Sequence, residues 1–121
     1  MIQGLRTVIY HVKDIQEAKA WYTAVLGKDP YFDQPFYVGY NLGGFELGLH
    51  PAAEKVIWGT NTVAYWGVGD AHKAYAELIA KGGLSQEPVS DVGDGILVGA
   101  VTDPFGNIFG IIENPHFKRE D

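Results

Sequence analysis

The sequence predicts an α+β fold built from two βαβββ modules, residues 1–58 and 59–121. Three observations lead to this prediction. A β-branched and aromatic segment near the start is followed by an aspartate and then by apolar residues at helical spacing. The same order returns after residue 61. A length of 121 residues fits one small domain with its own core.

The first module begins with a strand over Thr7–Val12, whose residues TVIYHV have the composition of a buried strand. Asp14 and Glu17 have the spacing of an N-terminal capping box, and helical periodicity follows them. Gly27 is expected at the C′ position of this helix, and Pro30 prevents the helix from continuing. The module therefore starts as strand and helix.

Each module is expected to close with two strands joined by a turn. In the first module the strands are Phe36–Leu42 and Phe45–His50, with a hairpin at Asn41-Leu42-Gly43-Gly44. In the second module the strands are Gly95–Thr102 and Asn107–Glu113, joined by the turn Asp103-Pro104-Phe105-Gly106-Asn107.

The second module opens like the first. It has a strand over Thr62–Val68, Asp70 as a helix cap, and a helix over Ala71–Lys81 that Gly82 and Gly83 end. Repetition of a whole strand–helix unit is a stronger fold signal than any single motif. Placing Asp14 on Asp70 gives the pairs Val12/Val68, Ala18/Ala74, Ala24/Ala80 and Gly27/Gly83.

Charge and composition exclude several classes of partner and site. Lys plus Arg number 9 and Asp plus Glu number 15, a net charge of −6, which disfavours nucleic acid and anionic membrane as partners. There is no cysteine, so disulfides, thiolate metal sites and a cysteine nucleophile are excluded. The sequence shows neither a signal-peptide pattern nor a run of about 20 apolar residues. A soluble cytoplasmic protein is expected.

Two stretches carry a resemblance to a known family. Val12–Pro30 contains a V-x-D element, the aromatic pair Trp21-Tyr22 and then Leu26-Gly27, and Thr102–Pro115 contains Asp-Pro-x-Gly-Asn. Over almost its whole length the chain resembles the vicinal oxygen chelate superfamily, which includes glyoxalase I, extradiol dioxygenases, fosfomycin resistance enzymes and bleomycin resistance proteins. The resemblance implies a cupped mixed sheet with helices on its outer face, often completed by a second subunit. A homodimer is therefore expected.

The resemblance also places the metal ligands of the family's enzymes on this sequence. The two positions on the first strands of the modules are Thr7 and Val63, and those on the last strands are Gly110 and Glu46 or, after a register change, Gly48. At most one of the four is a metal donor, and a divalent ion needs several. No metal and no cofactor are expected, and no catalytic residue is assigned.

Strand alternation selects candidate pocket residues. If Thr7 faces the cup, then Ile9 and His11 do too, because side chains alternate between faces. The same argument gives the predicted ligand pocket His11, Glu46, His50 and Tyr65. Each has an alternative reading as a strand-end hydrogen-bonding group or a solvated side chain, and His11, Glu46 and His50 are an alternative, non-standard metal site. Nearby aromatic residues are expected to stack on a planar or cationic ligand or to pack at a dimer contact: Tyr31, Phe32, Phe36, Tyr37 and Tyr40.

The favoured function is metal-independent binding of a small organic molecule of unknown identity, as in resistance or sequestering proteins. One alternative is an enzyme of the same superfamily with a non-standard active site, in which His11 and Glu46 transfer protons. Another is a regulatory or interaction module with a vestigial pocket. No nucleophile–base pair or phosphate-binding loop is present to favour a further class.

Overall fold

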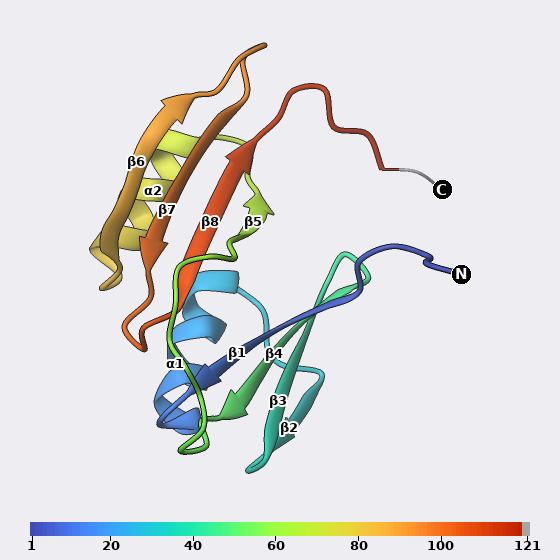
Figure 1. Cartoon of the computed structure of the whole chain (residues 1–121), viewed down its shortest axis with the longest axis vertical. Coiled ribbons are helices and arrows are strands. Elements are labelled where there is room, and N and C mark those ends of the chain that lie inside the picture. The colour runs from blue at the N-terminus through green and yellow to red at the C-terminus, as the bar shows by residue number, and fades with distance from the viewer. Residues whose placement is uncertain (120–121) are drawn as a thin grey trace. The chain divides into compact units, whose positions relative to one another are not determined.

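The computed structural model describes residues 1–119. The chain divides into two compact units, Met1–Trp58 and Gly59–Asp121. Each unit contains one helix and one four-stranded mixed sheet (Figure 1). The α+β class and the repeated order of strand, helix and three strands are therefore confirmed. No helix within residues 1–119 is long and apolar enough to cross a membrane.

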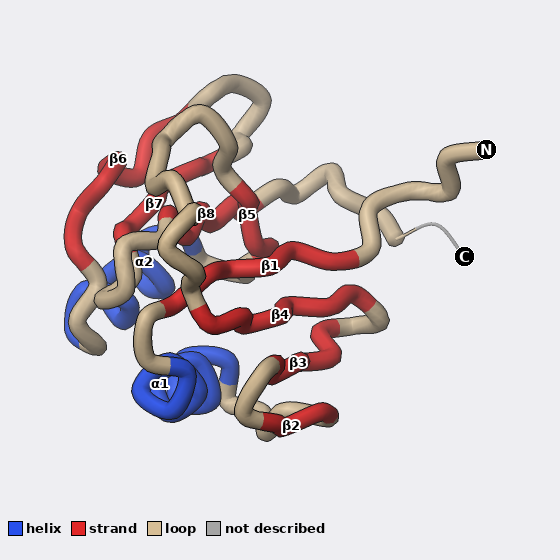
Figure 2. The backbone as a smooth tube through the Cα atoms, turned by 60° about the horizontal axis from the view of Figure 1, so that its bottom comes forward, coloured by secondary structure: helices blue, strands red, loops and turns tan. Residues whose placement is uncertain are grey.

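The first unit consists of β1 (Thr7–Val12), α1 (Ile15–Leu26), β2 (Phe32–Gln34), β3 (Tyr37–Leu42) and β4 (Phe45–Pro51). Its sheet has the order β1-β4-β3-β2, which Figure 2 shows from one edge to the other. β1 runs parallel to β4, and the other neighbours are antiparallel. A parallel β1–β4 pair brings two strands from opposite ends of the unit side by side.

The predicted limits of α1 are confirmed in atomic detail. The Asp14 carboxylate accepts hydrogen bonds from the backbone N–H groups of Gln16 at 3.0 Å and Glu17 at 3.1 Å. These bonds satisfy N–H groups that have no partner within the helix. At the other end Gly27 adopts a left-handed φ of 65°, and its N–H donates to the carbonyl of Thr23 at 2.9 Å.

One face of the first sheet packs against α1. The phenol of Tyr40 is within 2.9 Å of the Thr23 hydroxyl and donates to the Lys19 carbonyl at 3.0 Å, both on α1. The buried side chains on this face are Tyr10, Val12, Val38, Tyr40, Leu47 and Leu49. The opposite face, called here the pocket face, carries Thr7, Ile9, His11, Tyr37, Gly39, Glu46, Gly48 and His50. The predicted alternation along β1 and β4 is thus confirmed.

The second unit consists of β5 (Ala64–Gly67), α2 (Ala71–Ala80), β6 (Leu84–Asp91), β7 (Leu97–Thr102) and β8 (Ile108–Glu113). Its sheet order, β5-β8-β7-β6, repeats that of the first unit, with β5 parallel to β8. Figure 1 shows α2 against one face of this sheet. The predicted Asp70 cap is present, accepting from the Lys73 N–H at 3.1 Å, and the Glu113 carboxylate accepts from the Ala71 N–H at 2.8 Å.

The predicted turn between β7 and β8 is also confirmed. Asp103 is buried, and its carboxylate accepts from the N–H groups of Phe105 at 2.9 Å and Asn107 at 2.7 Å. Gly106 has a φ of 95°, a conformation that costs glycine little. This aspartate is accordingly a structural residue of the turn.

The prediction of two βαβββ modules does not locate the edge strands β2 and β6, and it places the start of β5 and the left-handed glycine after α2 differently. All residues of β2 and nearly all of β6 are exposed, so neither segment shows an apolar pattern. Pro88 lies where the β6–β7 register shifts, an arrangement typical of edge strands. β5 begins at Ala64, which leaves Val63 before the strand. The left-handed glycine after α2 is Gly82, with a φ of 106°, so the proposed pairing of Gly27 with Gly83 is wrong by one residue.

Candidate functional site

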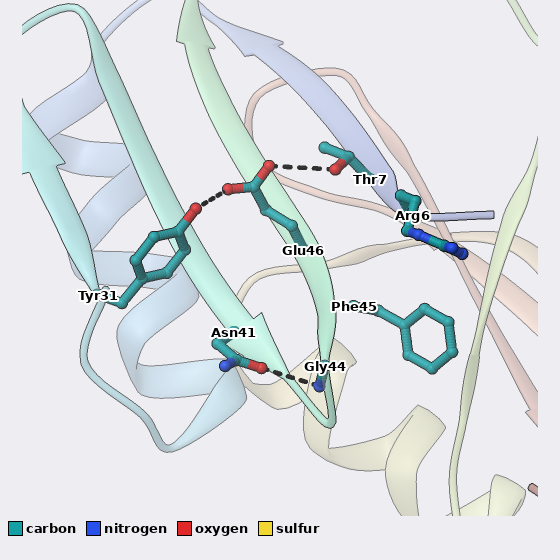
Figure 3. Close-up of a pocket in the computed structure, with 7 residues that line it drawn as sticks. All are labelled: Arg6, Thr7, Tyr31, Asn41, Gly44, Phe45 and Glu46. Atoms are coloured by element: carbon teal, nitrogen blue, oxygen red, sulfur yellow. Dashed lines mark hydrogen bonds between the residues drawn. The ribbon is translucent and has the colours of Figure 1, made fainter. Parts of the chain in front are cut away.

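A pocket of about 290 Å³ lies on the first unit, where β1 begins and the β3–β4 hairpin turns. Small-molecule pockets usually start at about 300 Å³, so the size suits a compact ligand or one end of a larger one. Figure 3 shows the residues around it. This Glu46 pocket is lined by Arg6, Thr7, Tyr31, Asn41, Gly44, Phe45 and Glu46.

The Glu46 carboxylate is held by three hydroxyl groups. Its Oε1 accepts from Thr7 Oγ1 at 3.1 Å and from the Tyr37 hydroxyl at 2.9 Å. Its Oε2 accepts a short hydrogen bond from the Tyr31 hydroxyl. In Figure 3 the carboxylate lies between the hydroxyls of Thr7 and Tyr31. The donors come from β1, from β3 and from the residue before β2, so folding of the whole sheet is needed to assemble the site.

Register and two glycines place these groups. Thr7 is the direct partner of Glu46 across the parallel β1–β4 pair. Gly39 and Gly48 are partners across β3 and β4. A β-carbon on Gly39 would be 3.0 Å from Glu46 Oε2 and 3.0 Å from a ring carbon of Tyr31. One on Gly48 would overlap the phenol of Tyr37. The two glycines thus leave the space that the tyrosine rings occupy above the strands.

The hydrogen bonds around Glu46 determine the charge states of its carboxylate and of the tyrosines that donate to it. The bond from Tyr31 lowers the pKa of Glu46, partial burial opposes it, and the bonds from Tyr37 and Thr7 add to the lowering. The pKa of Tyr37 rises to about 12, first through burial and then through its hydrogen bond to Glu46. The hydrogen bond to Glu46 also raises the pKa of Tyr31. At neutral pH the site therefore holds an ionised carboxylate and protonated phenols.

His11 and His50 form a separate pair on the pocket face. They are direct partners across β1 and β4, and their ring centroids are 5.3 Å apart in an edge-on arrangement. A strand rises about 3.3 Å per residue, so Glu46 lies about 13 Å from His50 along β4. In the part of the chain that the structure describes, no three His, Asp or Glu side chains gather into a group that could hold a metal ion. The structure does not bring His11, Glu46 and His50 together as the alternative metal site requires.

The positions that the family resemblance assigns to metal ligands do not fit a divalent ion. In the first unit Thr7 donates to Glu46, so this carboxylate already has hydroxyl partners. In the second unit a β-carbon on Gly110 would lie 2.8 Å from the Ala64 carbonyl oxygen and 2.9 Å from Val63 Cγ1. No larger side chain is accommodated at Gly110 without rearrangement. One carboxylate is the whole donor set, and divalent ions need several oxygen or imidazole ligands.

Of the four predicted pocket residues, only Glu46 lines the pocket in the first unit. Tyr65 belongs to the second unit, where it pairs with Gly110, has a ring carbon 2.8 Å from the position of a Gly110 β-carbon, and is 43% exposed. A ligand-binding role for His11, His50 and Tyr65 remains a prediction.

Sequence reasoning did not foresee that Tyr31 and Tyr37 donate to Glu46, because it treated them only as aromatic surfaces. One signal was present for Tyr37. The predicted hairpin turn fixes the pairing of the two strands, and alternation then places Tyr37 on the same face as Glu46. No such signal exists for Tyr31, whose position depends on the unpredicted β2 and on its N–H bond to the Gly39 carbonyl at 2.9 Å.

Comparison with known proteins agrees with this fold. The model of the Glyoxalase/Bleomycin resistance protein/Dioxygenase superfamily matches residues 4–111. The chain belongs to this superfamily. A search of curated proteins gives no match.

Solved structures of the same superfamily share the fold. A glyoxalase-related enzyme from Fulvimarina pelagi superimposes with a TM-score of 0.81 at 22% identity, over 98% of this chain and 94% of that one. Lactoylglutathione lyase from Agrobacterium tumefaciens superimposes with a TM-score of 0.76 at 17% identity, over 99% of this chain and 100% of that one. A glyoxalase/bleomycin resistance protein from Albidiferax ferrireducens T118 superimposes with a TM-score of 0.72 at 20% identity, over 91% of this chain and 98% of that one. At these identities the likeness shows the fold alone.

Proposed function

We propose that this superfamily member binds a small organic molecule without a metal ion, using the Glu46 pocket of its first unit. The observation that carries the proposal is the Glu46 carboxylate, which three neutral hydroxyls hold in one orientation beside a pocket. A charged group fixed in this way is pre-organised for a ligand, because little side-chain freedom is lost on binding.

The donor chemistry supports a role without metal. Thr7, Val63 and Gly110 stand at three of the four positions where the family's enzymes place metal ligands, and none of them supplies an imidazole or a carboxylate. The remaining position is Gly48, after a register change, or Glu46. Its two oxygens accept hydrogen bonds from hydroxyl groups, so its chemistry here is that of a hydrogen-bonded anion.

The alternative, an enzyme in which Glu46 transfers a proton, is less well supported. A general base works best when its pKa is near the working pH. The hydrogen bond from Tyr31 moves the pKa of Glu46 in the opposite direction, below its usual 4.5. Relatives of this fold include a glyoxalase-related enzyme and a lactoylglutathione lyase, but at 22% and 17% identity they do not extend those activities to this chain.

The proposal is tested by screening small organic fragments against ¹⁵N-labelled protein, with and without the chelator EDTA. We expect fragments that shift the amide signals of Thr7, Phe45 and Glu46, equally in both conditions. The matched variants are Glu46→Gln, which removes the charge from the pocket, and Glu87→Gln, which removes an exposed charge from β6. Binding should weaken in the first variant alone. Fragments that bind only after zinc or nickel is added would overturn the proposal.

A further inference from the structure

We propose that the Glu46 pocket selects organic cations, namely ligands that carry an ammonium, amidinium or guanidinium group on a compact apolar or aromatic body. The cationic group donates to Oε2 of Glu46. This inference rests on the proposed function, since it names the chemical class that the same pocket takes.

The carboxylate has one acceptor position left. Two carboxylate oxygens offer about four lone-pair sites in total. Oε1 accepts from Thr7 and Tyr37, and Oε2 accepts from Tyr31 alone. A donor group in the pocket can therefore reach Oε2 without displacing a hydroxyl.

Among the residues that the structure describes, the charge of Glu46 has no cationic partner. All three donors are neutral, and within residues 1–119 no lysine, arginine or histidine forms an ion pair with this carboxylate. Arg6 lines the pocket, but its guanidinium donates to the Leu5 carbonyl at 3.3 Å and to Gln3 Oε1 at 3.2 Å. Figure 3 shows its side chain leading away from Glu46. A cationic ligand would form a charge-assisted hydrogen bond to Glu46, and no cationic side chain within residues 1–119 forms one.

The walls suit the rest of such a ligand. Tyr31 and Phe45 both line the pocket and are both exposed, Tyr31 by 64% and Phe45 by 47%. Aromatic faces attract cations and also cover apolar groups. The overall charge of −6 favours the approach of a cation over that of an anion. Each of these features, like the open acceptor position on Oε2, favours a cationic ligand.

The test uses three probes of nearly the same shape: benzamidine as the cation, benzamide as the neutral probe and benzoate as the anion. Dissociation constants come from amide chemical-shift titrations of the full chain at neutral pH. We expect benzamidine to bind about tenfold more tightly than benzamide, because a hydrogen bond between two charged groups is stronger than one from a neutral amide to the carboxylate. Benzoate should bind most weakly. Glu46→Gln should reduce the preference for benzamidine to less than about threefold, and Glu87→Gln should leave it unchanged.

Two results overturn the inference and leave the proposed function standing. In one, benzamide or benzoate binds at the pocket as tightly as benzamidine, which would assign the dominant role to Arg6 or to the apolar walls. In the other, the preference for benzamidine survives in Glu46→Gln. If instead no probe and no screened fragment shifts the pocket signals, the proposed function fails as well. Should Glu46→Gln not fold, acidification of the wild-type protein below the Glu46 pKa provides the same loss of charge.

Discussion

A β-carbon on Gly48 would lie 2.0 Å from the hydroxyl oxygen of Tyr37, so the hydrogen bond from Tyr37 to Glu46 depends on glycine at position 48. Family resemblance makes Gly48 a possible metal-ligand position, after a register change. Its role in the structure is instead to leave room for a phenol. The atom that a side chain at position 48 would meet is the far end of the tyrosine, not the backbone, so the ring can turn aside.

This relationship predicts the outcome of Gly48→Ala. The strands should form as before, while the Tyr37 ring leaves Glu46 and becomes exposed. The pKa of Tyr37 should then fall from about 12 toward its ordinary 10, because burial and the Glu46 hydrogen bond both raise it. Titration of ¹³C-labelled tyrosine rings by NMR measures this, with Tyr37→Phe to assign the signal. The control is Gly67→Ala, where a β-carbon meets nothing within 4 Å. An unchanged Tyr37 titration in Gly48→Ala would contradict the geometry.

The Glu46 network also predicts a dependence of stability on pH. Its pKa is lowered in the folded state, so the contribution to stability is present above the unfolded value of 4.5 and is lost as the pH falls through the lower folded value. Urea unfolding of the wild type and Glu46→Gln should therefore show a difference that is constant near neutrality and shrinks below pH 4.5. A difference that instead grows on acidification would reverse the assigned sign.

The sequence determines the local parts of this fold well. Asp14, Gly27 and the Asp103–Asn107 turn act through contacts within a few residues, so their roles follow from residue type and spacing. The alternation of side chains between the two faces of β1 and β4 can also be predicted from the sequence, because burial of one face leaves a clear apolar pattern. It placed Glu46 on the pocket face with Thr7.

The rest of the site depends on long-range register, which the sequence shows weakly. β2 has three exposed residues and no apolar alternation, yet its pairing with β3 brings Tyr31 to Glu46. The space for the two phenols comes from Gly39 and Gly48, whose partnership appears only when β3 and β4 are aligned. Selecting the polar residues of the predicted strands therefore identifies Glu46 as an acceptor, but it does not identify Tyr31 and Tyr37 as donors to it.

Metal content provides a direct check of the proposed function. Protein purified without a metal-affinity tag should contain far less than one equivalent of zinc, nickel, iron or manganese, because Thr7, Val63 and Gly110 supply no metal donor. Elemental analysis measures this, and a thermal melt with each ion tests for weak sites. Specific binding raises stability with ligand concentration, so a marked rise in Tm at micromolar metal would count against the proposal.

We also expect the chain to form a homodimer. Exposed edge strands such as β2 and β6, together with exposed apolar side chains such as Phe32 and Phe36, are surfaces that proteins usually cover. Sedimentation equilibrium at micromolar concentration should give twice the chain mass of 13.3 kDa. A species at the single-chain mass across that range would refute the prediction.

The pH dependence of ligand binding should distinguish Glu46 from the histidines. Benzamidine keeps its positive charge from pH 7.5 to 5.5, and Glu46, with a pKa below 4.5, keeps its negative charge. His50 lies about 13 Å from Glu46 along β4, beyond the Debye length of about 10 Å at 0.1 M salt. The affinity for benzamidine should therefore stay almost unchanged over this range. Affinity should fall only below pH 4.5, as Glu46 is protonated. A loss of affinity between pH 7.5 and 5.5 that His50→Gln abolishes would move the ligand from the Glu46 pocket to the histidine pair.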